Sequence, residues 1–144
     1  MNHVVLLNGS TSAGKTSIAR EVQRQSPALF LNASIDAFIN MLPIRLRSHP
    51  DGIAIEAREN GGIHLVFGPA AFAMQQAFHR AVAAMADVAN VIVDDCLFDP
   101  RLLPDWQHAL EKRHVFLVGV HCSLAELERR EQERGDRMIG QARA

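Results

Sequence analysis

The sequence contains little cysteine and no metal-binding motif. Its two cysteines, Cys96 and Cys122, stand outside any CxxC or zinc-ligand spacing, and none of its seven histidines belongs to an HExxH motif. The pattern therefore indicates neither a disulfide framework nor a common structural zinc site. So few cysteines are typical of a protein from a reducing compartment.

An excess of charge and a long apolar run are also missing. The formal net charge is −1 over 144 residues, and no apolar run approaches the length of a membrane-spanning helix. Residues 1–7 lack the basic region and the apolar stretch of a signal peptide. We therefore expect a cytoplasmic protein with no nucleic-acid partner and no membrane partner.

The apolar residues that are present predict a single α/β domain over residues 1–144. Short apolar runs alternate with amphipathic stretches, which is the pattern of parallel strands joined by helices. The expected strands are 3–8, 28–34, 90–96 and 114–122, and the expected helices are 15–25, 35–42, 69–90, 102–113 and 123–135. We expect a parallel sheet of buried strands with helices on both faces. Ligands bind such sheets at the carboxyl ends of the strands.

Residues 43–68 interrupt this alternation. The segment carries two prolines and four glycines, and two apolar runs within residues 52–68 flank the turn-forming sequence RENGG. It therefore predicts an inserted β-hairpin. Together with helix 35–42, the hairpin is expected to shape the pocket for a second substrate.

The first expected strand is followed by a stretch of small residues, GSTSAGKT, which matches the pattern GxxxxGK[ST]. Small residues let backbone N–H groups surround a phosphate, and the following helix presents the positive end of its dipole. The stretch therefore predicts a P-loop that binds a phosphate group, in which Lys15 reaches the terminal phosphates and the Thr16 hydroxyl holds Mg²⁺. The residues of this predicted site are Gly9, Ser10, Thr11, Ser12, Ala13, Gly14, Lys15 and Thr16.

Acidic residues follow the second expected strand and end the third. Asp36 is either a general base for a substrate hydroxyl or a helix N-terminal acid that the helix dipole favours. Asp94 and Asp95 occupy the Walker-B position, where a carboxylate helps to hold Mg²⁺. The two side chains should point to opposite faces of the sheet, and the sequence leaves open which of them serves the metal.

Two arginines lie in the segment ERGDR near the end of the chain, within a partial lid that we expect at about residues 130–144. Arg134 and Arg137 could close over a nucleotide and neutralise charge on the moving phosphoryl group. The alternative is an exposed basic pair on a charged helix, and the spacing alone favours that alternative.

Several stretches, in this order, resemble the chloramphenicol phosphotransferase family of small P-loop kinases: LLNGSTSAGKTSIAR, SIDAFINMLP, GGIHLVFGP, VIVDDC and ERGDRMIGQAR. The resemblance implies a P-loop kinase fold and transfer of the γ-phosphoryl group of ATP, with Mg²⁺, to a hydroxyl of a small molecule. It favours Asp36 as the catalytic base. It also favours Arg134 and Arg137 as catalytic lid arginines, which would act together with Lys15.

Members of this family continue beyond the RGDR segment with a last strand, a loop that packs on the adenine base and a closing helix. We expect this chain to lack the last strand and helix, and therefore to bind nucleotide weakly, to form a homo-oligomer through the exposed sheet edge, or both. The resemblance favours chloramphenicol as the small molecule, and two alternatives stay open. One is a kinase for another small metabolite, and the other is a non-catalytic nucleotide-binding remnant.

Overall fold

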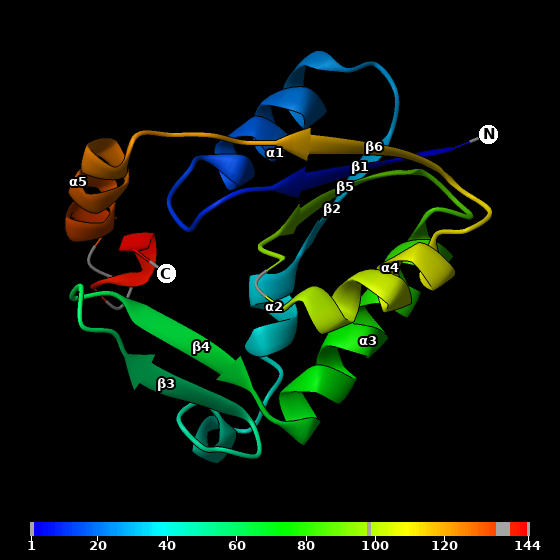
Figure 1. The fold of residues 1–144 in the computed structure, drawn as a ribbon. Coiled ribbons are helices and arrows are strands. Elements are labelled where there is room, and N and C mark those ends of the chain that lie inside the picture. The colour runs from blue at the N-terminus through cyan, green and yellow to red at the C-terminus, as the bar shows by residue number, and fades with distance from the viewer. Residues whose placement is uncertain (1, 98, 135–138, 144) are drawn as a thin grey trace.

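A four-stranded parallel sheet forms the centre of the protein (Figure 1). The computed structural model describes residues 2–97, 99–134 and 139–143. The strands of the sheet are β1 (His3–Asn8), β2 (Phe30–Ser34), β5 (Asn90–Asp95) and β6 (His114–Gly119). Their order is β2-β5-β1-β6, so β1 and β5 occupy the middle. This arrangement confirms the expected α/β class.

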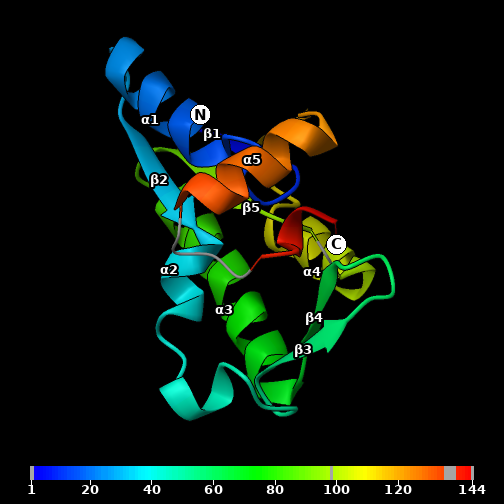
Figure 2. The ribbon, with the colours of Figure 1, turned by 90° about the vertical axis from the view of Figure 1, so that its left-hand side faces the viewer.

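Helices cover both faces of the sheet, as expected. Helix α1 lies on one face, and α3 and α4 lie on the other (Figures 1 and 2). The helices are α1 (Lys15–Gln25), α2 (Ile35–Ile39), α3 (Pro69–Met85), α4 (Leu103–Ala109) and α5 (Leu124–Arg134), with 3₁₀ turns at Ile44–Leu46, Pro100–Leu102 and Gln141–Arg143. None of the helices in the described part of the chain is long and apolar enough to cross a membrane.

The alternation of side chains along β5 explains how two separate cores form. Ile92 packs with Leu7 and Ala19 beneath α1, whereas Val91 and Val93 face α3 and α4. Burial of each such side chain contributes about 1.5–3 kcal/mol to folding. The apolar side chains of β5 are therefore buried on both faces of the sheet, because helices cover both faces.

The expectation that every strand is buried is wrong for β6. All six of its residues are exposed, with Phe116 55% and Leu117 65% accessible to solvent. The strand pairs with β1 along one side and forms the edge of the described sheet. No described helix packs over it. An apolar run predicts that a strand forms, but it does not predict what will cover that strand.

The expected hairpin is present and stands apart from the main sheet. Strands β3 (Ile53–Ala57) and β4 (Ile63–Phe67) pair antiparallel, with Ile53 opposite Phe67. Side chains from the base of the hairpin pack with Ala71 in the first turns of α3. The hairpin therefore extends from α3 towards α5, on the side where the strands of the main sheet end (Figure 1).

Candidate active site

The loop between β1 and α1 contains two residues in the left-handed backbone region. Gly14 has φ of +102° immediately before α1, a backbone conformation that residues other than glycine rarely adopt. Ser12 has φ of +66°, which costs a non-glycine residue about 1–2 kcal/mol. Its hydroxyl is also buried, without a hydrogen-bond partner among the described residues. Strain and an unpaired donor in one loop are typical of a ligand site.

The Lys15 side chain folds back over this loop. Lys15 is only 6% exposed, and its Nζ donates to the carbonyl oxygens of Gly9 at 2.8 Å and Ser10 at 3.0 Å. The same nitrogen lies 3.1 Å from the Sγ of Cys96, whose pKa is raised by burial. Among the described residues, the ammonium group is therefore held beside the loop by carbonyl dipoles rather than by a carboxylate in direct contact.

Two of the three residues predicted to hold magnesium, Thr16 and Asp94, lie together. The Thr16 hydroxyl, on α1, donates to Oδ2 of Asp94 at the end of β5, with an O–O distance of 2.5 Å. A short contact of this kind between a hydroxyl and a carboxylate is a charge-assisted hydrogen bond. It brings a hydroxyl oxygen and a carboxylate together at the mouth of the loop.

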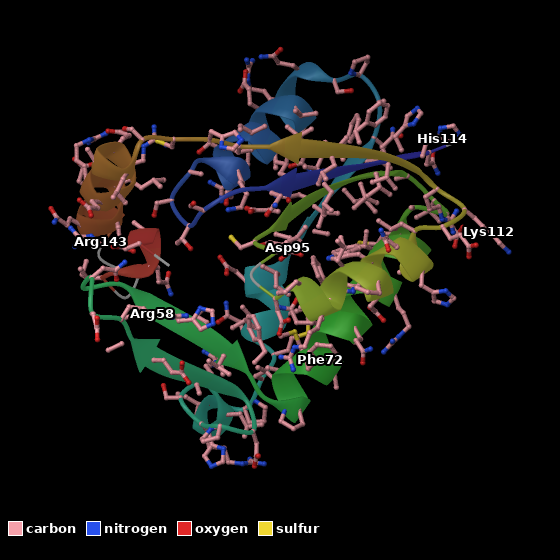
Figure 3. The ribbon with its side chains drawn as sticks, in the orientation of Figure 1. Arg58, Phe72, Asp95, Lys112, His114 and Arg143 are labelled. Carbon is pink, nitrogen blue, oxygen red and sulfur yellow. The ribbon has the colours of Figure 1, made fainter. Side chains whose placement is uncertain are left out.

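Asp95 is directed to the other face of the sheet. It accepts hydrogen bonds from the backbone N–H of Cys96 at 2.7 Å and from the indole N–H of Trp106 at 3.2 Å. Burial raises the pKa of Asp95 to about 6. Figure 3 labels Asp95 where β5 ends. Of the two acids that the sequence left open, only Asp94 lines the pocket beside the loop.

The site opens into a pocket of about 440 Å³ at the carboxyl ends of the strands. Its lining residues are Thr11, Ser12, Gly14, Lys15, Thr16, Ser17, Ile35, Asp36, Asp94, Cys96, Arg130 and Glu133. Asp36, in the first turn of α2, thus shares one cavity with the P-loop. The lining includes no residue of the described hairpin, so the hairpin's part in binding a second substrate stays a prediction.

The structure identifies one arginine that sequence reasoning missed. Arg130 lies on α5 with Nη1 3.4 Å from the carbonyl oxygens of both Ser12 and Ala13, and its Nε donates to Glu126 at 2.6 Å. Arg130 precedes Arg134 by one helical turn, so helical spacing could have placed it on the same face. Only the backbone of Arg134 is described, and Arg137 lies outside the described residues.

A polar cluster supports the end of β5 from behind. His79, fully buried on α3, stacks on Trp106 with ring centroids 4.0 Å apart, and its Nδ1 pairs with Asp105. Burial lowers the pKa of His79. The indole that His79 stacks on is the one that donates to Asp95. The cluster therefore holds the end of β5 in place, where Asp94, the residue before Asp95, lines the pocket.

Comparison with known proteins gives a family and a relative. The family model described as "Chloramphenicol phosphotransferase-like protein" matches residues 2–144. A curated protein of Mycobacterium tuberculosis (strain H37Rv), which carries the provisional name O-phosphotransferase, is 35% identical over 146 residues. The match covers 95% of this chain and 65% of the relative, so the chain spans about two thirds of the relative's length.

Solved structures of similar fold are more distant in sequence. The tunicamycin resistance protein of Deinococcus radiodurans is similar with a TM-score of 0.64 and 12% identity, over 99% of this chain and 76% of that one. A gluconokinase from Sinorhizobium meliloti 1021 gives a TM-score of 0.58 and 14% identity, over 97% and 69% of the two chains. At such identities the likeness shows the fold alone, which is that of a P-loop kinase.

Proposed function

The chain belongs to the chloramphenicol phosphotransferase-like family, and from that membership we propose that it transfers the γ-phosphoryl group of ATP, with Mg²⁺, to a hydroxyl of a small molecule. The observation that carries the proposal is the hydrogen bond between Thr16 and Asp94. This bond joins the P-loop to the aspartate at the end of β5, and both residues line the cavity that Asp36 also lines.

The residues of the pocket fit Mg²⁺ and a nucleotide phosphate. A hydroxyl and a carboxylate are the hard oxygen ligands that Mg²⁺ prefers. The buried Ser12 hydroxyl lacks a partner among the described residues, and a phosphate oxygen would supply one. When bound, Mg²⁺ would offset the charge of the phosphate oxygens.

Side chains of this protein would bind the phosphates, neutralise charge and accept the proton. Lys15 is held beside the loop by two carbonyl oxygens and would exchange them for phosphate oxygens. Arg130 lies over the same loop and would neutralise charge that develops on the phosphoryl group. Asp36 would accept the proton of the attacking hydroxyl, and its presence in the lining of the same pocket supports that role. The predicted roles of Arg134 and Arg137 stay proposals.

Calorimetry with Mg²⁺–ATP tests the nucleotide site. Lys15→Ala is expected to weaken binding at least about tenfold, because it removes charge-assisted contacts to phosphate. Lys112→Ala is the matched control: Lys112 is exposed and far from the pocket (Figure 3). Binding that survives Lys15→Ala unchanged would contradict the proposed site.

Phosphorylation assays with a panel of hydroxyl compounds, beginning with chloramphenicol, test the reaction. Asp36→Asn is expected to reduce transfer by about 10²–10⁴-fold while nucleotide binding persists, because the base is lost and the pocket is not. Asp87→Asn, the same change at an exposed position outside both the pocket and the inserted segment 43–68, is expected to leave transfer unchanged.

The panel also separates the two other candidates. Transfer to a sugar, a nucleoside or another metabolite, but not to chloramphenicol, would favour the metabolite kinase. Binding of ATP without transfer to any acceptor would favour a non-catalytic nucleotide-binding protein.

A further inference from the structure

Residues 139–143, which we call the strap, contact the tip of the β3–β4 hairpin. The backbone N–H of Ile63, the first residue of β4, donates to the carbonyl oxygen of Gly140 at 3.1 Å. Nη1 of Arg143 donates to the carbonyl oxygen of Asn60 in the hairpin turn at 2.8 Å. Figure 3 shows Arg143 beneath α5, at the same end of the hairpin as Arg58. The strap is therefore bonded to the hairpin at two points.

Glu131 on α5 holds the other side of the strap. It is only 2% exposed. Its Oε2 accepts from the backbone N–H of Gly140 at 2.8 Å, and its Oε1 accepts from that of Ala142 at 3.0 Å. Both carboxylate oxygens are thus used on one short segment. Buried hydrogen bonds to a charged acceptor are among the stronger ones in proteins, so this contact fixes the strap to the helix.

The strap also reaches the P-loop. Ala142 packs in one buried cluster with Leu127 of α5 and Ala13 of the loop. Arg130, the residue before Glu131, contacts the carbonyl oxygens of that loop. Successive residues of one helix therefore contact the phosphate pocket and the strap.

We propose that Glu131 is a positioning residue, which acts through the strap to fix the hairpin tip relative to the P-loop. The proposal rests on the proposed function. A nucleotide that binds both the loop and Arg130 stabilises α5 against the loop, and the strap passes this stabilisation to the hairpin. By linkage, binding in the pocket then reduces opening of the hairpin, and a fixed hairpin favours nucleotide binding by the same factor.

Amide hydrogen exchange at Ile63, followed by NMR, measures opening of the hairpin directly. Without nucleotide, Glu131→Gln is expected to raise the exchange rate of Ile63 about tenfold, because the amide NH₂ cannot accept from the second backbone N–H. Exchange of Ile92 in β5 is expected to stay unchanged. Glu111→Gln, at an exposed position remote from the strap, is the matched control.

Saturation with Mg²⁺ and a non-hydrolysable ATP analogue tests the link to the pocket. In the wild-type protein, the bound analogue is expected to slow exchange at Ile63 relative to the protein without nucleotide. In Glu131→Gln this slowing by the analogue is expected to be lost. Arg143→Ala, a substitution at an exposed position that we expect to leave the fold intact, is expected to produce a smaller loss of the same sign. If Glu131→Gln does not fold, the Arg143→Ala variant tests the strap proposal instead.

Two results would overturn the strap proposal. One is an Ile63 exchange rate that does not respond to bound analogue, or that responds equally in wild type and variant. The other is faster exchange in β5 as well as in the hairpin, which would make Glu131 a general stabilising residue. If calorimetry detects no binding to the wild-type chain, the proposed function itself has failed, which is a separate observation.

Discussion

The two strands that flank β1 both carry an apolar run, but their surroundings are opposite. β5 (NVIVDD) and β6 (HVFLVG) both pair with β1 in parallel. Residues 91–95 of β5 are buried between α1 and α3, whereas all of β6 is exposed at the sheet edge. The difference teaches that apolar residues determine that a strand forms, whereas its neighbours in space determine how much that strand stabilises the fold.

The same charged substitution on each strand gives the largest expected contrast. Val93→Asp is expected to cost more than about 4 kcal/mol and to prevent folding, because it buries an unpaired charge. Leu117→Asp is expected to change the free energy of unfolding by no more than about 0.5 kcal/mol, since its side chain already faces solvent. Urea unfolding followed by circular dichroism measures both values.

Comparable losses at both positions would contradict this contrast. They would mean that β6 is covered in solution, and sedimentation velocity of the wild-type chain would then show whether a second copy covers it. Homo-oligomer formation through this edge stays a prediction.

Substitution of two glycines is expected to have an intermediate effect. Gly9 follows β1 and lies against Val120, whereas Gly119 ends β6. A Cβ at Gly9 would lie 2.3 Å from the carbonyl oxygen of Val120, which follows β6, so Gly9→Ala must displace backbone. We expect a loss of about 1–3 kcal/mol and weaker binding of ATP. Gly119→Ala is the matched control, because its Cβ would meet only the ring of His121, at 3.1 Å. Thermal unfolding and calorimetry compare the two, and equal effects would show that Val120 gives way easily.

The smallest expected effect is a pH dependence on the β5 side. Burial lowers the pKa of His79 below its ordinary 6.5, so the folded protein holds this side chain neutral. The stability due to the neutral form is present above pH 6.5 and is lost as the pH falls through the lowered pKa. Unfolding between pH 5 and 8 should therefore show a shallower acid loss in His79→Gln than in wild type. His108→Gln, at an exposed position, should match the wild type, and identical profiles for all three proteins would refute the assignment.

The sequence predicted the elements whose signals are local. Helix α1 has the predicted bounds, because the P-loop pattern fixes where it starts. Helix α3 begins at Pro69 as predicted but ends at Met85 rather than at residue 90, since apolar residues continue into the turn that follows it. Local patterns thus identify starts better than ends.

Other features depended on contacts between distant segments. Alternation along β5 implied that Asp94 and Asp95 diverge, but only the position of α1 decides that Asp94 meets Thr16. The exposure of β6 depends on what covers it. Arg130 was missed because an arginine on a charged helix looks the same in sequence whether or not it reaches a loop.

The surroundings of Trp106 provide an optical signal from within the protein. The sequence has one tryptophan and no tyrosine, so intrinsic emission excited in the indole band comes from this residue alone. Its ring is buried against His79, and its N–H is bonded to the aspartate adjacent to the one in the pocket. A change at the end of β5 should therefore alter the wavelength or intensity of the fluorescence, and nucleotide titrations can be followed without attaching a dye.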